Sequence, residues 1–368
     1  MDNIPPSENE FELTLFGTGY GECILVHALE NKWIIIDSCI NPVSRKIAAL
    51  EYLESIGVEA STQVEMLVVS HWHEDHIKGL NEICRLCSDA EIVLSQAMGS
   101  KEFLRFVNVV NQRKIYSYAG KSTDEIKKIL ETVLKKKSSG EFRVKWASAD
   151  KPLYSKKIND ELPIFNMISL SPLDHSITSA SIEMAKKISA SNTEITVQSA
   201  TNPNHFAIVL WVSIGDTHIL LGSDLEERAH PKGAWTVIAN NENRHGLMAD
   251  VFKVPHHGSE NAYCKHVYDN MLTDKHLSVL TPFTWGKVTL PGEADIARLK
   301  EQKCSDIFMA CRSSGKNTRH NSVVEKILKE STKSRKTLNS FGYITLRKNV
   351  SDGNSDWQIF TKGQAHKL

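Results

Sequence analysis

Short runs of apolar, β-favouring residues recur along the chain, and most are bounded by glycine, proline or polar residues. Near the N-terminus, three strands are predicted by "FELTLF", "CILVHA" and "KWIIIDS". Later runs of the same kind are "VEMLVVS", "EIVLS", "NMISLSP", "HFAIVLWVSIG", "THILLGSD", "MADVFKVP", "LSVLTP", "DIFMAC", "FGYITLR" and "WQIF". Some of these runs are separated by segments whose apolar residues have helical spacing, namely "NPVSRKIAALEYLESIG", "IKGLNEICRLC" and "GEADIARLKEQ". This order predicts a layered α/β protein.

Two segments depart from the strand pattern. Residues 100–160 predict a helical insertion, and its basic run "KKILETVLKKK" is typical of a solvated helix face and less often of a polyanion-binding surface. The glycine-rich "GTGYGE" joins two predicted strands, so we interpret it as a tight β-turn; no helix follows it, as a phosphate-binding loop would require. We interpret residues 1–368 as one domain carrying this insertion.

Composition narrows the class of protein. Lys+Arg and Asp+Glu both total 44 in 368 residues, so the net charge is zero. The charge therefore gives no indication of a nucleic-acid or membrane partner. No apolar run approaches the ~18–20 residues of a membrane span, and the first residues lack a secretory signal, so no membrane association is expected. Seven scattered cysteines suit a reducing cytoplasm. Cys84 and Cys87 have no second pair nearby, so they are interpreted as packed helix thiols rather than a zinc site.

Candidate metal chemistry follows the strand "VEMLVVS", in the sequence "HWHEDH". His71 and His73 are two residues apart, so in an extended turn they project to the same side. Asp75 and His76 follow closely enough to serve a second ion. Imidazole and carboxylate groups together suit zinc, manganese or iron. We therefore predict a metal site at the end of this strand.

Two more predicted strands end in residues of the same type. Asp224 ends "ILLGSD", where an acid can bridge two ions, and His256 and His257 end "VFKVPHHGS". If these strand ends converge on one rim of the sheets, the residues form a dinuclear site.

These motifs resemble the metallo-β-lactamase superfamily of αββα metallohydrolases. Within it, the chain is most similar to the hydrolase domain of bacterial DNA-uptake (competence) channel proteins and their free-standing relatives. The resemblance rests on "LFGTGYGECILV", "WIIIDS", "SHWHEDH", "NHFAIVLWV", "ILLGSD", "KVPHHGS" and the tail "FGYITLR…WQIF". It covers most of the chain outside residues 100–160, and it implies a four-layer αββα sandwich.

The resemblance also implies residue roles. His71 and His73 hold the first ion, Asp75 and His76 the second, and Asp224 bridges them. His257 aligns with the last ligand, which leaves His256 to contact phosphate or donate a proton; the reverse assignment of these two histidines stays open. Asp37 is expected to support the loop of residues 71–76 without binding an ion itself.

Three positions depart from the family pattern. Superfamily members usually supply a third histidine to the first ion, and here Asn204 aligns closest to it, with His205 one step beyond. Glu22 replaces a usual aspartate, and Leu290-Pro291 stands where the branch usually has His-Pro. The first ion is therefore expected to be weakly held, and one phosphate contact is expected to be missing.

The function expected from these features is metal-dependent hydrolysis with two divalent ions, zinc or manganese. A metal-bridging hydroxide attacks, Asp75 orients it, and His256 protonates the leaving group. The resemblance favours a phosphodiesterase or nuclease in DNA processing, with nucleic acid or another phosphodiester as partner. Bases such as the 127–137 run, Arg312, Lys316 and Arg319 can hold a backbone, although no aromatic stacking platform is evident. Two alternatives remain, a hydrolase of a small ester, lactone or amide and a non-catalytic metal-binding scaffold.

Overall fold

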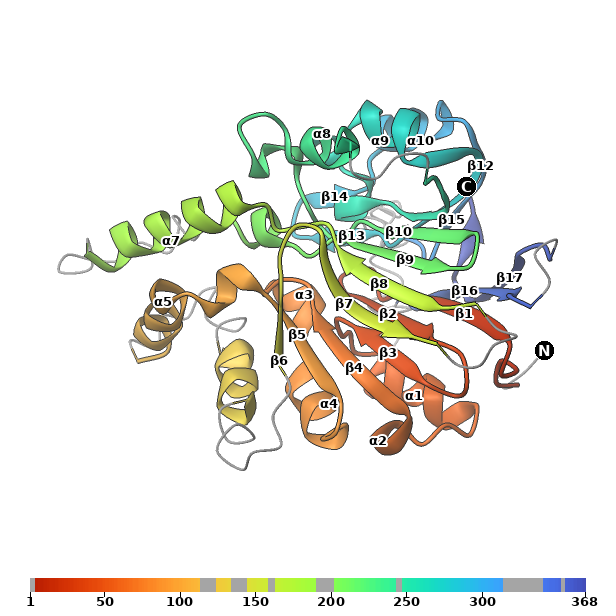
Figure 1. Ribbon diagram of the computed structural model, residues 1–368, viewed down its shortest axis with the longest axis horizontal. Helices are drawn as coiled ribbons and strands as arrows, with labels where there is room; N and C mark the ends of the chain where they lie inside the picture. The colour runs from red at the N-terminus through yellow and green to blue at the C-terminus, as the bar shows by residue number, and fades with distance from the viewer. Residues whose placement is uncertain are drawn as a thin grey trace, which may run out of the picture.

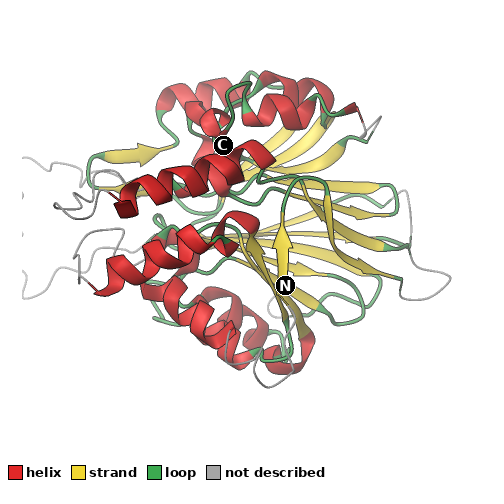
Figure 2. Cartoon of the chain, turned by 60° about the vertical axis from the view of Figure 1, so that its left-hand side comes forward, coloured by secondary structure: helices red, strands yellow, loops and turns green. Residues whose placement is uncertain are grey.

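Two eight-stranded sheets lie face to face, and helices cover the outer face of each (Figures 1 and 2). The computed structural model of the chain describes residues 4–112, 124–133, 144–157, 163–189, 202–242, 247–313, 340–351 and 355–368. In Figure 1, α1, α2 and α4 lie below the sheets, and α8, α9 and α10 lie above them. The expected αββα sandwich is confirmed.

The first sheet combines antiparallel strands at one side with parallel strands at the other. In spatial order its strands are β17 (Gln358–Gly363), β16 (Gly342–Asn349), β1 (Glu10–Gly17), β2 (Glu22–His27), β3 (Trp33–Ile36), β4 (Val64–Val69), β5 (Glu91–Ser95) and β6 (Val144–Ala147). Parallel neighbours need a crossover, and helices between β3, β4 and β5 supply it.

The second sheet is built in the same mixed way. In spatial order its strands are β18 (His366–Lys367), β15 (Cys304–Met309), β12 (Leu272–Leu280), β11 (Ala249–Lys253), β10 (Thr217–Leu221), β9 (Leu210–Ile214), β8 (Phe165–Ser169) and β7 (Lys151–Lys156). A separate hairpin consists of β13 (Phe283–Trp285) and β14 (Val288–Leu290).

Helices of very different length connect the strands. The α-helices are α1 (Ala48–Ser55), α2 (Ala60–Gln63), α3 (Glu74–Ile77), α4 (Leu80–Leu86), α5 (Lys101–Gln112), α7 (Asp174–Ser189), α8 (Ala234–Ala239), α9 (Lys265–Asn270) and α10 (Glu293–Lys300), and residues 124–133 are also helical. Short 3-10 helices are η1 (Gln96–Gly99), η4 (Pro203–Phe206), η5 (Glu227–Ala229), η7 (Pro255–Gly258) and η8 (Glu260–Ala262).

The strands have two buried faces, which explains their nearly continuous apolar sequences. In β4, Met66 and Val68 point into the core between the sheets, whereas Leu67 and Val69 point into the core beneath the outer helices. Successive side chains of a strand alternate between its faces, so each strand contributes to two cores. A third core packs the second sheet against its own helices. The layers and the three cores follow from the same alternation.

The expected extent of the helical insertion is corrected by the structure. Residues 101–112 and 124–133 are helical, but residues 144–147 and 151–156, inside the predicted 100–160 range, form β6 and β7 at the edges of the two sheets. Both strands are only partly buried, so they lack the apolar runs by which the inner strands were recognised. Residues 134–137 of the predicted basic run lie outside the described residues.

Smaller expectations are confirmed. The glycine-rich turn joins β1 to antiparallel β2, with Gly17 opposite Glu22. Cys84 lies in α4 and Cys87 caps it, and both pack in the core beneath that helix.

The segment after β8, which has no clear apolar pattern, contains α7, whose buried side chains include Ala180 and Met184.

Candidate metal centre

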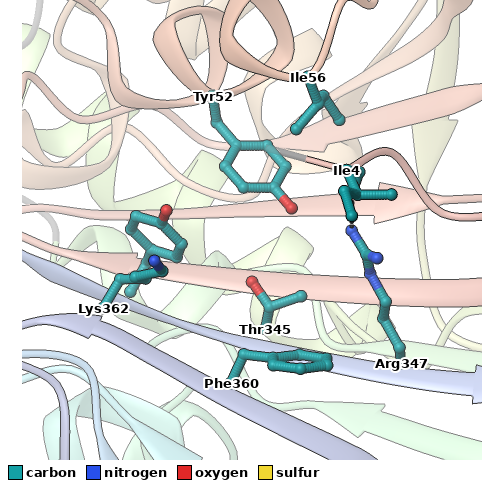
Figure 3. A pocket seen from close by; sticks show the side chains of 8 residues that line it. Ile4, Tyr52, Ile56, Thr345, Arg347, Phe360 and Lys362 are labelled. Carbon is teal, nitrogen blue, oxygen red and sulfur yellow. Dashed lines mark hydrogen bonds between the residues drawn. The ribbon is translucent and has the colours of Figure 1, made fainter. Parts of the chain in front are cut away.

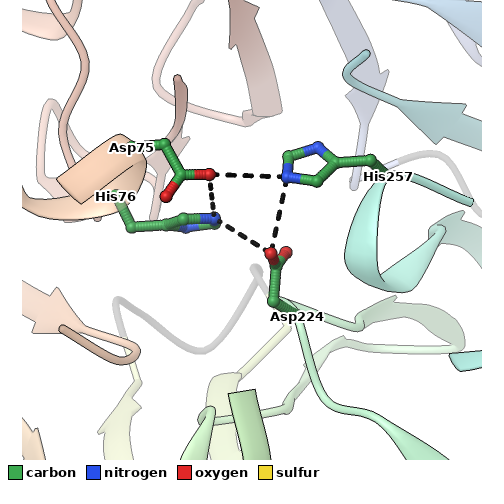
Figure 4. A group of neighbouring side chains, drawn as sticks. All are labelled: Asp75, His76, Asp224 and His257. Carbon is green, nitrogen blue, oxygen red and sulfur yellow. Dashed lines mark ion pairs between the residues drawn. The ribbon is translucent and has the colours of Figure 1, made fainter. Parts of the chain in front are cut away.

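The candidate ligands gather where three strands of the two sheets end. The loop after β4 carries residues 71–76, the loop after β10 carries Asp224, and η7 after β11 carries His257. Figure 4 shows four of these side chains pointing toward a common centre. The distant sequence motifs are therefore brought to one rim of the sandwich, as the strand pattern predicted.

One group of four side chains can surround an ion. Asp224 Oδ2 lies 3.4 Å from Nε2 of both His76 and His257 (Figure 4). Asp75 Oδ2 lies 3.6 Å from each of the same two nitrogen atoms. Two imidazoles and two carboxylates that alternate around a centre form a ligand set typical of zinc and related divalent ions.

A second group shares one member with the first. His71, His73 and Asp224 offer ligand atoms that all lie within 4.8 Å of one another. Asp224 therefore belongs to both groups, which is the position of a carboxylate that bridges two ions. The structure thus brings together the residues that sequence motifs assigned to the first ion, the second ion and the bridge.

Buried polar atoms without partners show that these residues fit metal ions. Among the described residues, Nε2 of His71, His76 and His257 and Oδ1 of Asp75 and Asp224 are buried without a hydrogen bond. A buried polar atom that lacks a partner is costly, and bound cations would give the Nε2 atoms of the three histidines partners.

Asp37 holds two of the histidines in the orientation that ligation needs. Its Oδ2 accepts hydrogen bonds from His76 Nδ1 at 2.8 Å and from the Ser70 hydroxyl at 2.5 Å, and its Oδ1 accepts from Ser70 N–H at 2.8 Å. Because the Ser70 proton goes to Asp37, His71 Nδ1, 2.9 Å from Ser70 Oγ, donates to that oxygen. With both Nδ1 atoms acting as donors, Nε2 of each imidazole is the atom available to a metal ion. This arrangement is consistent with the expected supporting role of Asp37.

His257 is also held in its orientation by hydrogen bonds, an arrangement that was not predicted from the sequence. His257 Nδ1 lies 3.0 Å from Thr281 Oγ1, and that hydroxyl donates to Glu22 Oε2 at 2.5 Å. Lys253, fully buried, contacts Glu22 Oε1 at 2.6 Å and the Ser223 carbonyl at 2.9 Å. A buried lysine is rare unless it is paired, so the lysine inside the apolar run "DVFKVP" was the signal available in the sequence.

The backbone at η7 decides which histidine faces the ions. His256 and His257 have φ of 46° and 54°, and Gly258 follows with φ of 80°. Left-handed backbone at two bulky residues is uncommon and costs about 1–3 kcal/mol each. This backbone directs His257 into the ligand cluster, whereas His256 points toward Asn204 and Asn261.

Both ring nitrogens of His256 are engaged. Asn204 Nδ2 lies 3.0 Å from His256 Nε2, and His256 Nδ1 lies 2.8 Å from Asn261 Oδ1. Because an amide nitrogen only donates, Nε2 accepts and the proton resides on Nδ1. To protonate a leaving group, His256 must break one of these hydrogen bonds.

Asn204, the residue that the motif alignment put closest to the third-ligand position, lies in η4 and contacts His256. Its Nδ2 also donates to Glu226 Oε1 at 3.1 Å, which fixes the amide orientation and leaves Oδ1 buried without a partner among the described residues. His205 instead directs Nε2 to Glu226 Oε2 at 3.7 Å and belongs to neither ligand group. Of the two candidates, Asn204 is better placed for a third ligand.

Glu226 was missed by sequence reasoning. Burial opposes its charged form, but hydrogen bonds from His205, Asn202 and Asn204 outweigh burial and lower its pKa to about 2. A glutamate two residues after a predicted ligand gives no distinct sequence signal. In the structure this carboxylate positions Asn204.

The electrostatics of the cluster favour a cation. Burial opposes ionisation of Asp224, yet the facing imidazoles of His257 and His76 hold its pKa well below the usual range. Burial likewise opposes a charged His257, but Asp224 and Asp75 raise the pKa of His257 to about 9. The two carboxylates thus attract positive charge, which divalent ions supply more strongly than protons.

A pocket of about 200 Å³ opens onto the cluster. It is lined by His73, Asp75, Asp224, His256, His257, Phe283 and Trp285. A different pocket, of about 40 Å³, includes Tyr52, Thr345 and Arg347 in its lining (Figure 3). Its Arg347 is engaged by Glu12 at 2.6 Å and by the Ile4 carbonyl at 2.6 Å. Of these two pockets, the larger one is lined by candidate ligands.

Comparison of the sequence with protein families supports the resemblance to the metallo-β-lactamase superfamily. The model described as "Metallo-beta-lactamase superfamily" matches residues 16–102, which run from the end of β1 through β5 and include residues 71–76. Together with the two ligand groups, this match indicates a metal-dependent hydrolase or a related enzyme that binds divalent metals. No curated protein sequence matches the chain.

Two solved structures show a distant likeness to the chain. A mutant of the CmlA beta-hydroxylase aligns with a TM-score of 0.32 and 12% identity over 68% of this chain and 36% of its own, so the chain spans about a third of that protein. Zn(2+)-bound PqqB from Methylobacterium extorquens aligns with a TM-score of 0.31 and 9% identity, over 78% of this chain and 85% of its own. Scores of this size carry no argument about activity.

No helix in the described parts of the chain combines the length and the apolar character needed to span a membrane.

Proposed function

We propose that the protein is a metal-dependent phosphodiesterase, with nucleic acid as its substrate. The observation that carries the proposal is the position of Asp224 in both ligand groups, because a shared carboxylate holds two ions at one site. When bound, a pair of divalent cations lowers the pKa of water toward ~7 and offsets charge on both the entering and the leaving oxygen of a phosphodiester. The sequence motifs shared with the DNA-uptake branch add support for a nuclease.

The chain's own residues have distinct roles in this proposal. His71 and His73 would hold one ion, Asp75, His76 and His257 would hold the other, and Asp224 would serve both ligand groups. Asp75 has one oxygen facing the two imidazoles and the other, Oδ1, without a hydrogen bond, so Oδ1 can orient an attacking water. His256 lines the pocket beside them and can contact a phosphate oxygen or, after its Nδ1 releases Asn261, supply a proton from that nitrogen.

Basic residues in the described segments can hold a nucleic-acid backbone only locally, since the net charge is zero. Lys287 is exposed at the turn of the β13–β14 hairpin, beside the pocket residue Trp285. Arg312 follows β15, whereas Lys316 and Arg319 lie outside the described residues. Binding that depends on such contacts weakens as salt rises.

The test begins with metal analysis of purified protein, followed by incubation with zinc or manganese and single-stranded DNA, duplex DNA, RNA or a 4-nitrophenyl ester. Cleavage of a nucleic acid that falls with ionic strength and disappears in Asp224→Ala supports the proposal. Hydrolysis of the ester alone, with little salt dependence, assigns the site to small esters, lactones or amides. Protein that retains no metal and hydrolyses none of these substrates is a scaffold.

A further inference from the structure

Aromatic rings form a row that leads out of the metal pocket. The His257 ring stacks on Phe283, with centroids 5.2 Å apart and planes at 26°. Tyr20 then contacts Phe283 at 5.4 Å and Trp285 at 5.0 Å between ring centroids. Trp285 is 52% exposed, and it lines the pocket together with Phe283. The row therefore begins at a candidate ligand and ends at Trp285, a half-exposed ring in the pocket lining.

The glycine-rich turn between β1 and β2 places Tyr20 in this row. Thr284 N–H in β13 donates to the Gly19 carbonyl at 2.8 Å, so the turn and the hairpin are joined through their backbones. On its other side the turn touches the metal loop, because a Cβ on Gly21 would lie 3.1 Å from the Asp75 carbonyl oxygen. The turn thus has a role beyond reversing the chain: it connects the metal loop to the aromatic hairpin.

From this geometry we infer that Tyr20, Phe283 and Trp285 form a stacking surface for an unpaired base of a single-stranded nucleic acid whose phosphodiester enters the metal pocket. The inference rests on the proposed phosphodiesterase activity and names the form of its substrate. Stacking on aromatic rings tolerates any base, because every base has a π-face. In a duplex the bases stack on each other and hide these faces, so an unpaired strand fits better.

Two features of the hairpin favour a nucleotide over an apolar partner. Lys287 is exposed at the turn next to Trp285, where its ammonium group can meet a backbone phosphate. The large apolar side chains that the hairpin exposes are Trp285 and its cross-strand neighbour Val288, each at 52%, which is a small area for a protein or lipid interface. A ring beside a cation, both next to a hydrolytic site, matches the repeating base and phosphate of a single strand.

The experiment measures how metal-loaded wild type and metal-loaded Trp285→Ala bind and cleave two substrates. One is a single-stranded DNA oligonucleotide, and the other is an oligonucleotide of the same length with abasic sites in place of its bases. We expect Trp285→Ala to weaken binding of the normal oligonucleotide about tenfold or more, as loss of one stacked base does, with little change for the abasic one. Trp285→Phe should retain most of the affinity. The matched control is Val288→Ala, equally exposed on the same hairpin but outside the pocket lining, which should bind as wild type does.

The outcomes separate the two proposals. If wild type cleaves normal and abasic strands alike and Trp285→Ala reduces both or neither, the stacking surface is refuted while the phosphodiesterase stands. If wild type binds neither strand and hydrolyses only a 4-nitrophenyl ester, the proposed function fails and the inference fails with it. Preference of wild type for a duplex over the single strand also overturns the inference. Unchanged metal content and circular dichroism in Trp285→Ala exclude misfolding as the cause of a loss.

Discussion

Asp224 directs Oδ2 to Nε2 of His257 across 3.4 Å, although the two residues follow different strands, β10 and β11. These strands are parallel neighbours, so their carboxyl ends meet at the same edge of the sheet. The candidate metal centre therefore depends on strand pairing as much as on the ligand residues.

Removal of the bridging carboxylate should affect both ions. We expect Asp224→Ala to lose nearly all hydrolysis and most bound metal, whereas His71→Ala should lose mainly one ion. Metal content by mass spectrometry and circular dichroism measure the two effects, and the fold should persist because neither side chain is part of an apolar core. Asp216→Ala is the matched control, since Asp216 is exposed at the opposite end of β10. Full activity in Asp224→Ala would show that the site is misassigned.

The first ion should be the more weakly held. Its proposed third ligand, the amide oxygen of Asn204, would bind zinc-like ions less well than imidazole and would suit manganese better. A mild chelator should remove one ion early, and manganese should restore activity at least as well as zinc. Asn204→His should slow that loss, and Asn204→Ala should hasten it.

His205 provides the comparison for this test, because it lies beside Asn204 but faces Glu226. His205→Ala should change metal retention less than Asn204→Ala. A greater loss in His205→Ala would assign the third ligand to His205, and tight retention of two zinc ions in all variants would contradict weak binding.

Trp72 should stabilise the metal loop through packing. Its ring stacks on Phe206, with centroids 5.5 Å apart and planes at 8°, and contacts Phe103 of α5 at 4.8 Å. Trp72→Ala leaves a cavity in this buried cluster and should lower the free energy of unfolding by about 3–5 kcal/mol. Chemical denaturation measures the loss, and Trp72→Phe should lose clearly less. Equal losses in the two variants would show that ring packing is not the cause.

His27 should make stability depend on pH away from the metal site. Burial lowers the pKa of His27 from 6.5 to about 4, although the contact of its Nδ1 with the Glu10 carbonyl, 2.7 Å away, acts in the opposite direction. Its Nε2 accepts a hydrogen bond from Asn31 N–H at 3.1 Å. Between pH 6.5 and 4 the unfolded chain binds a proton at this residue and the folded chain does not. The free energy of unfolding should therefore fall across that window by on the order of 3 kcal/mol, with no further loss below it.

This pH effect is measured on metal-free protein by denaturation at pH 7 and pH 4.5. His27→Gln lacks the titrating group, so its stability should decline less between the two values than that of wild type. A parallel decline in both proteins would assign the acid sensitivity to other groups.

The sequence pattern determined the layered α/β class and the main ligand candidates, and the resemblance of the motifs to a known family implied the αββα sandwich. Strands such as β4 are buried on both faces, so their apolar runs are long enough to recognise without a structure. Polar, metal-binding residues directly after such strands are equally conspicuous, since a buried strand end has few other reasons to carry "HWHEDH".

Only the tertiary structure decided how the ligands are supported, which histidine faces the cluster and what lines the pocket. His257 rather than His256 joins the ligands because of left-handed backbone at η7, a local geometry that residue types do not reveal. Glu22, Thr281 and Lys253 come from three separate strands or strand ends, and their hydrogen bonds exist only once the two sheets pack together. Tyr20 and Trp285 meet for the same reason: contacts between residues far apart in sequence depend on how the layers are stacked, and the hydrophobic pattern specifies the layers but not those pairings.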